Sequence, residues 1–364
     1  MKISRVHTQI VNLPDEVSLA GLPGQPPVSQ VITLQLETDE GIEGIAVSFT
    51  FFAKALTKSL KSAVEGLGEL FIGEDPMVPE TILSKLRLAA GGAGPGGIYM
   101  LAFSAIDIAL WDIRGKALGQ PLWKLLGGQP KRLPAYASGA LQRGLSNDEV
   151  SRAASCLAKM GFTRIKMQLG LPGEHSPAKE FERARIVRAA VGPDVQLMAD
   201  ANQRWRVEQA ITLGRRLEEL DFLWFEDFTS HEDYVGLSRI AGTLITPIAG
   251  GEYVWGIAPF RHMLEAHAAD ILIIDALRAG GITQWMKVAG MAEAFNVRIV
   301  NHCFPEFLVH VMAAVSNGFI LEYMPWTFKL FEQIPEVHKG EVIVPDRPGL
   351  GLAFDQEYLK RNSA

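Results

Sequence analysis

Three acidic residues recur at equal intervals in the middle of the chain. Asp200, Glu226 and Glu252 are each 26 residues from the next, and each ends a short apolar run, in "VQLMADAN", "FLWFEDF" and "TPIAGGEY". In a β/α barrel, successive parallel strands carry their C-terminal residues to one rim, so this spacing brings the three carboxylates together. Oxygen ligands from three strands suit Mg²⁺, which keeps open positions for water and an anionic substrate. We therefore expect a Mg²⁺ site at Asp200, Glu226 and Glu252.

Further polar side chains end the neighbouring predicted strands. A solvated charge is the ordinary explanation for any one of them, but not for the whole series. His302 ends the run "VRIVNH", and Asp275 on the preceding strand can bond one ring nitrogen, which makes the imidazole more basic. His302 is thus a candidate general base, with a purely structural histidine as the alternative. The remaining members of the series are Lys166, Gln168, Asn202 and Glu322.

The elements that must position these residues alternate regularly from about residue 133. Helical patterns such as "NDEVSRAASCLAKM" and "PAKEFERARIVRAAV" separate eight strand candidates. An irregular tail replaces the last helix, so the pattern predicts a modified (β/α) barrel. A doubly wound open sheet is the alternative, but the glycine-rich first turn typical of that fold is missing. The strand candidates are 133–138, 162–168, 195–200, 222–227, 246–252, 270–275, 297–302 and 318–323.

The N-terminal third follows a different pattern. Residues 1–52 alternate as strands, with a hairpin turn at Asp39-Glu40-Gly41, and three helical patterns follow at 54–71, 79–90 and 98–118. Strands followed by helices indicate a separate α+β module. The Pro- and Gly-rich tail "GEVIVPDRPGLGLAFDQEYL" is expected to return to this module.

Composition restricts the class of protein. The 364 residues are 48% hydrophobic with a mean hydropathy of +0.12, which suffices for a large core. A net charge of -6 gives no general attraction to nucleic acid or anionic lipid, and no stretch approaches the roughly 18 apolar residues of a membrane span. We expect a cytoplasmic protein without nucleic-acid or membrane partners, in which Cys156 and Cys303 are reduced thiols.

Several segments, taken in order, resemble the enolase superfamily in its mandelate racemase/muconate lactonizing enzyme-like group, specifically the mandelate racemase subgroup. They are "AFSAIDIALWDIRGKALGQPLWKLLGG", "DANQRW", "FED", "AGGE", "DALRAGGIT" and "NHCFPE". The resemblance implies an α/β fold, a modified TIM barrel of the (β/α)7β type at residues 126–334. It also implies an α+β capping domain, formed by residues 1–125 and completed by 335–364. The family is often dimeric or octameric, so we expect a homo-oligomer.

The same resemblance implies Mg²⁺ on the three carboxylates and a catalytic dyad of His302 and Asp275. Removing a proton α to a carboxylate places a second negative charge on it, and Mg²⁺ stabilises this ene-diolate throughout the superfamily. Lys166 would add positive charge. Glu322 would donate a hydrogen bond if crowded carboxylates raise its pKa, and a salt-bridged structural Glu322 is the alternative.

One position departs from the family pattern. The family's racemases carry Lys-x-Lys on the second barrel strand, with the second lysine as a base, whereas this chain has Lys166-Met167-Gln168. Glutamine cannot accept a proton at useful pH, so two-base racemisation is disfavoured. His302 would act as base and then acid, dehydrating an aldonate or aldarate to a 2-keto-3-deoxy acid. Gln168 and Asn202 would bind hydroxyl or carboxylate groups of this small-molecule carboxylate substrate.

Two other functions remain open. A one-base epimerase, racemase or cycloisomerase of a less polar carboxylate is favoured if Leu19, Leu22, Phe49, Phe51 and Phe52 form an apolar lid, although these residues also suit packing between the domains. A barrel that binds metal and acid without turnover is an alternative from another class.

Overall fold

The computed structural model describes residues 1–13, 16–17, 19–20, 23–24, 28–173 and 175–364. Its N-terminal part contains an antiparallel sheet in the order β1-β4-β5, and the predicted hairpin turn joins β4 to β5. Gly41 in this turn has φ of 78°, a left-handed conformation that glycine adopts without steric cost. The strands here are β1 (Ile3–Asn12), β2 (Glu16–Val17), β3 (Pro23–Gly24), β4 (Gln30–Thr38) and β5 (Glu43–Ser48).

Helices pack on this sheet and link it to the barrel. They are α1 (Thr57–Glu69), α2 (Pro79–Ala90), α3 (Gly97–Ala117) and α4 (Leu122–Leu125). Helix α3 is buried on nearly every side, because it contacts α1 and β5 on one side and two barrel helices on the other. Its Asp107 accepts a hydrogen bond from Thr283 N in the barrel, and its Asp112 accepts one from Ile45 N in β5. This buried helix therefore fixes the capping part against the barrel.

The barrel has eight parallel strands in sequence order. The ring passes from β6 to β12, and β13 pairs with β6, while a parallel bridge between Ile299 and Gly318 joins β12 to the segment before β13. The strands are β6 (Arg132–Leu141), β7 (Arg164–Gln168), β8 (Gln196–Asp200), β9 (Phe222–Glu226), β10 (Ile248–Gly250), β11 (Ile271–Asp275), β12 (Arg298–His302) and β13 (Leu321–Tyr323). Each overlaps a predicted strand.

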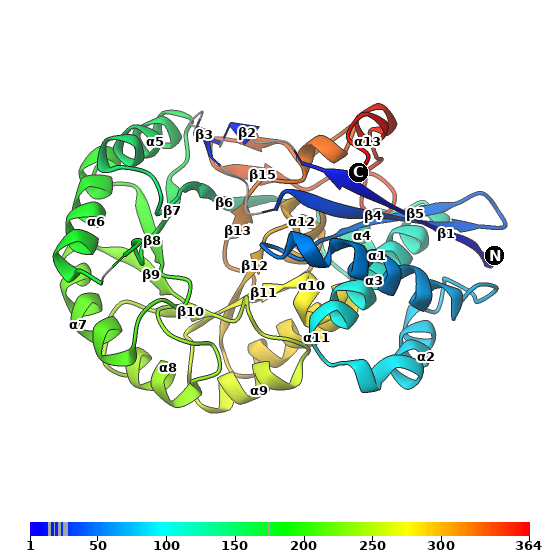
Figure 1. The fold of residues 1–364 in the computed structure, drawn as a ribbon, viewed down its shortest axis with the longest axis horizontal. Helices are drawn as coiled ribbons and strands as arrows, with labels where there is room; N and C mark the ends of the chain where they lie inside the picture. The colour runs from blue at the N-terminus through cyan, green and yellow to red at the C-terminus, as the bar shows by residue number, and fades with distance from the viewer. Residues whose placement is uncertain (14–15, 18, 21–22, 25–27, 174) are drawn as a thin grey trace.

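Helices follow the first seven barrel strands, which confirms the predicted (β/α)7β architecture. The helices that follow β6 to β10 form an arc outside the strands (Figure 1). The helices after all seven strands are α5 (Asn147–Lys159), α6 (Pro177–Val191), α7 (Val207–Leu217), α8 (Tyr234–Ala241), α9 (Ala258–Glu265), α10 (Ala276–Ala279), α11 (Gly281–Ala294) and α12 (Pro305–Ala314). Local sequence explains their starts: at α5, Ser146 and Glu149 cap each other's backbone N–H groups in a capping box.

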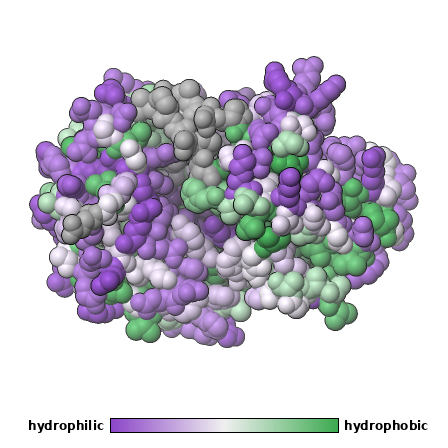
Figure 2. Space-filling view, in the orientation of Figure 1, coloured by the Kyte–Doolittle hydropathy of each residue, from purple (hydrophilic) through white to green (hydrophobic). Residues whose placement is uncertain are grey.

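The inside of the barrel is a compact apolar core, distinct from the larger core between strands and helices. It is built from Tyr136, Met198, Trp224, Ala249, Ile271, Ile273, Val300 and Ile320. The barrel strands are parallel, so the polar residues at their C-terminal ends lie at one rim, above this apolar core. On the face seen in Figure 2, hydrophilic residues cover much of the barrel side.

The C-terminal tail returns to the N-terminal sheet, as expected. Its first part, β14 (Val337–His338) and β15 (Glu341–Ile343), extends the barrel sheet, because β15 pairs antiparallel with β6. Its last part, with α13 (Gln356–Arg361), reaches the N-terminal sheet. Gln9 Nε2 donates to the Leu359 carbonyl at 3.0 Å, and Ala364 N donates to the Ile10 carbonyl at 3.0 Å. The capping part is thus formed by both ends of the chain (Figure 1). Within the described ranges, no helix has the length and apolar character needed to cross a membrane.

Candidate active site

Three buried carboxylates meet at the C-terminal rim. Asp200 and Glu226 end adjacent strands and pair in register, and Glu252 follows β10 by two residues. One oxygen of each lies within 4.8 Å of the others. The structure therefore brings together the three residues predicted to bind metal.

The electrostatics of these carboxylates fit a divalent cation. Burial raises the pKa of Asp200 to about 6, with Glu252 adding to the shift and Lys166 opposing it. Burial likewise raises the pKa of Glu226 to about 8, against the influence of Lys166. Three buried carboxylates beside one lysine leave excess negative charge, which a cation neutralises. The donor set consists of oxygen atoms alone, as Mg²⁺ prefers.

Lys166 and Glu322 form an ion pair at the edge of this set. Lys166 Nζ lies 2.5 Å from Glu226 Oε1 and 2.8 Å from Glu322 Oε1. Burial raises the pKa of Glu322, but the charge of Lys166 and a 2.7 Å hydrogen bond from Cys303 N outweigh it and lower the pKa to about 2. The expected raised pKa is therefore wrong. Glu322 is ionised and accepts hydrogen bonds, as in the salt-bridged alternative.

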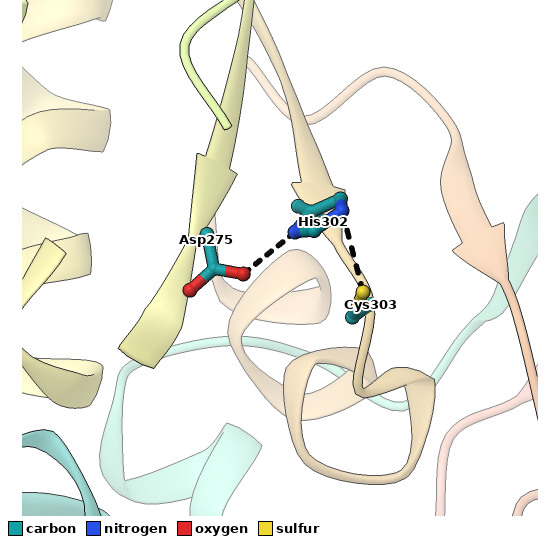
Figure 3. A group of neighbouring side chains, drawn as sticks. All are labelled: Asp275, His302 and Cys303. Carbon is teal, nitrogen blue, oxygen red and sulfur yellow. Dashed lines mark hydrogen bonds and ion pairs between the residues drawn. The ribbon is translucent and has the colours of Figure 1, made fainter. Parts of the chain in front are cut away.

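The predicted dyad is formed by neighbouring strands. Asp275 and His302 pair in register, and His302 Nδ1 lies 2.6 Å from Asp275 Oδ2 (Figure 3). The other ring nitrogen, Nε2, lies 3.3 Å from Glu252 Oε2 and 3.3 Å from Cys303 Sγ. If Nδ1–H donates to Asp275, Nε2 is the nitrogen that can take a proton, and it faces the carboxylate set.

The basicity of His302 follows from these neighbours. Burial lowers the pKa of its imidazole, but the interactions with Cys303, with the Glu252 carboxylate and with Asp275 together raise it well above its usual value. Burial raises the pKa of the Cys303 thiol to about 12, so this side chain is neutral. Both cysteines are free thiols, as expected.

Gln168 and Asn202 are engaged by a residue that sequence reasoning missed. Gln168 Oε1 accepts hydrogen bonds from Arg143 N at 3.2 Å and from Arg143 Nε at 3.4 Å. Arg143 also donates through Nη2 to Asn202 Oδ1, and Asn202 Nδ2 donates to Asp200 Oδ2 at 2.8 Å and to the Tyr253 hydroxyl at 3.1 Å. The position of Arg143 after the first barrel strand could have identified it as a site residue. The predicted strand ended at residue 138, whereas β6 continues to Leu141.

The residues considered for an apolar lid differ in their packing and exposure. Phe49 is buried and stacks on Phe304 with ring centres 5.0 Å apart, so it packs the capping part on the barrel. The Phe51 ring is stacked on the His302 ring with ring centres 6.1 Å apart. The guanidinium carbon of Arg278 lies 3.8 Å from the centre of the Phe51 ring. Phe52 is 83% exposed. Leu19 packs against the core, and Leu22 lies outside the described residues.

Comparisons with known proteins agree with this architecture. Residues 7–127 match the family model "Mandelate racemase / muconate lactonizing enzyme, N-terminal domain", and residues 148–358 match "Enolase C-terminal domain-like". Arabinonate dehydratase of Saccharolobus solfataricus is 32% identical over 351 residues, covering 93% of this chain and 92% of its own. The 3,6-anhydro-alpha-L-galactonate cycloisomerase of Streptomyces coelicolor is 31% identical over 367 residues, covering 99% of each chain.

A solved relative shows the same fold. The crystal structure of L-talarate dehydratase from Polaromonas sp. JS666, complexed with Mg and L-glucarate, superposes with a TM-score of 0.90 at 30% identity, over 100% of this chain and 97% of the other. Two matching family models and a shared fold over the full chain confirm the resemblance found in the strand-end motifs. The chain belongs to the enolase superfamily, in the mandelate racemase/muconate lactonizing enzyme group.

Proposed function

We propose that this protein is a Mg²⁺-dependent hydro-lyase that removes the proton α to a substrate carboxylate and dehydrates a sugar acid to a 2-keto-3-deoxy acid. One observation carries the proposal: His302 Nε2 faces the carboxylate set while Asp275 holds the opposite ring nitrogen. The arabinonate and L-talarate dehydratases among the relatives support this reaction class.

Asp200, Glu226 and Glu252 would hold Mg²⁺, the metal present in the Polaromonas structure. A bound Mg²⁺ would supply positive charge where the second negative charge forms on the substrate carboxylate. Lys166 adds to this charge stabilisation. Glu322 orients Lys166 through its 2.8 Å ion pair.

His302 would perform both proton transfers. Its Nε2 takes the α-proton and becomes imidazolium, which Asp275 stabilises through the hydrogen bond at Nδ1. The same Nε2–H then protonates the β-hydroxyl as its C–O bond breaks, so that one water leaves and an enol remains. The enol tautomerises to the 2-keto acid. Base and acid are one residue, so proton removal and loss of hydroxyl occur on the same face.

The environment of Gln168 disfavours two-base racemisation. The Gln168 side chain accepts hydrogen bonds from Arg143 and has no basic atom to accept a proton at neutral pH. A one-base cycloisomerase stays as the second candidate, because apolar Phe51 stacks beside His302 and a relative carries that activity. Product analysis separates the two reactions: dehydration gives a 2-keto acid with loss of water, whereas cycloisomerisation conserves the substrate's mass.

The His302→Asn variant tests the proposal. With an accepted sugar acid in D₂O, the wild-type protein should exchange the α-proton and form keto acid, while the variant should lose both and still bind Mg²⁺. His262→Asn is the matched control, because His262 is an exposed barrel-helix residue. Unchanged exchange in His302→Asn contradicts the assignment. If a library of sugar acids stays unreacted despite bound Mg²⁺, the non-catalytic barrel becomes the better explanation.

We further propose an assembly, a location and a domain boundary for this protein. The family resemblance supports a homo-oligomer, dimer or octamer, in the cytoplasm. For the division into residues 1–125 with 335–364 and residues 126–334, the hydrogen bonds of Leu359 and Ala364 with β1 support placing the end of the tail in the capping part. Light scattering on the purified protein would contradict the assembly proposal if it found a monomer.

A further inference from the structure

Arg143 lies among the active-site side chains and bonds two side-chain amides. It is half-buried, and its guanidinium donates to the side-chain oxygens of Gln168 and Asn202, which are both neutral amides. Among the carboxylates of the described residues, none forms an ion pair with Arg143 within 4.0 Å. The positive charge is therefore held in place but not neutralised.

The surroundings of Arg143 favour an incoming anion. Burial lowers the pKa of its guanidinium, Asp200 opposes this, and the nearby charge of Arg204 adds to it. An arginine nevertheless stays protonated at physiological pH. A partly desolvated guanidinium whose hydrogen bonds go to neutral amides gains free energy when a carboxylate bonds to it directly.

The position of Arg143 indicates which part of a substrate can reach it. Asn202 bonds Arg143 through its oxygen and Asp200 through its nitrogen, so one amide separates the guanidinium from a proposed Mg²⁺ ligand. Arg143 and Asn202 follow β6 and β8, and Gln168 ends β7, whereas Asp275 and His302 end β11 and β12. An acid with one carboxylate at the Mg²⁺ site and its α-carbon facing His302 can extend its chain towards Arg143.

We propose that Arg143 binds a second carboxylate at the far end of the substrate, so that the preferred substrates are aldarates, the dicarboxylic sugar acids. A carboxylate matches the planar guanidinium and neutralises it, whereas the terminal hydroxymethyl group of an aldonate does neither. Gln168 and Asn202 are positioning residues for Arg143. This inference rests on the proposed function and narrows its substrate class.

Paired substrates test the inference. Each aldarate of a panel is measured beside the aldonate of the same configuration, for example galactarate beside galactonate, with Mg²⁺ present. In every accepted configuration the wild-type protein should prefer the aldarate in kcat/KM. Arg143→Met should reduce that preference about 100-fold, the value of a charge-assisted contact. Arg143→Lys keeps the charge and should restore part of the preference.

Arg185→Met is the matched control for the loss of one guanidinium, because Arg185 is exposed and pairs with Glu182 on α6. It should leave the preference unchanged. Equal losses on aldarates and aldonates in Arg143→Met would indicate a structural role and overturn the inference, as would a wild-type preference for aldonates.

Measurements of substrate binding separate the proposed dehydration from the proposed second-carboxylate site. Calorimetry with the Mg²⁺-loaded protein measures the affinity for each pair without requiring turnover. If no acid reacts but aldarates bind more tightly to the wild-type protein than to Arg143→Met, the proposed reaction fails and the second-carboxylate site stands. If aldarates bind no more tightly than aldonates, the site is absent even when dehydration occurs.

Discussion

The proposed proton transfers depend on one hydrogen bond, the 2.6 Å contact between His302 Nδ1 and Asp275 Oδ2. Asp275 also accepts from Arg278 N at 2.8 Å, so its carboxylate is held on both sides. This rigidity fixes the ring orientation and keeps Nε2 directed at the site. The sequence predicted the pair, because residues that end adjacent parallel strands lie side by side.

Asp275→Asn is expected to lower kcat by a factor on the order of 10³. The amide can donate to Nδ1, which would leave the proton on Nε2 and remove the base. It also cannot stabilise the imidazolium by charge. Deuterium exchange at the α-carbon measures the first step directly, and Mg²⁺ affinity serves as the control for folding. Exchange within a few-fold of the wild-type rate would contradict the dyad.

Glu322 and Arg143 show what residue type and spacing do not predict. Strand position placed Glu322 at the rim, but its protonation depends on whether burial or the charge of Lys166 dominates, and Lys166 dominates. Arg143 belongs to a loop after a strand whose end was placed three residues early. The protonation of Glu322 and the contacts of Arg143 both depend on distances between segments that are far apart in the chain. The pattern of residues along the sequence does not contain these distances.

Parallel strands place most of the site, and the loops above them determine its surroundings. All eight barrel strands were predictable, because apolar runs of four to eight residues alternated with helical patterns. The conformation of the loop after β5 was not predictable from such a pattern. There Phe51 adopts φ of 50°, rare for a non-glycine residue, and this conformation accompanies its stacking beside His302 while Phe52 stays exposed.

Phe51→Ala should reduce kcat/KM about tenfold, because the ring contacts both His302 and Arg278 and excludes water from them. Phe52→Ala is the matched control, since the neighbouring ring is 83% exposed and should be replaceable without effect. Steady-state kinetics on an accepted acid compares the two variants. Equal behaviour of the two would show that Phe51 is not part of the site.

At the scale of the whole molecule, the C-terminal tail connects the two parts of the chain. His310 in α12 is a buried point in this connection, because its Nδ1 accepts from Trp123 N at 3.4 Å and its Nε2 bonds the Leu350 carbonyl at 2.9 Å. This pattern requires a neutral ring with the proton on Nε2. His310 therefore has a packing role between α4 and the tail.

Stability should fall at acid pH partly because of His310. Burial lowers its pKa from 6.5 to about 4 in the folded chain, against the opposing bond to Leu350. The unfolded chain takes up this proton at higher pH than the folded chain, so acidification from pH 6.5 towards 4 favours unfolding, by up to roughly 3 kcal/mol.

The His310→Gln variant lacks this titration. The difference in free energy of unfolding between the wild-type protein and His310→Gln, measured in urea, should therefore shrink as pH falls. His267→Gln, at an exposed position, should follow the wild-type profile. A wild-type advantage over His310→Gln that stays constant from pH 7 to 4.5 would show that the buried ring does not resist protonation.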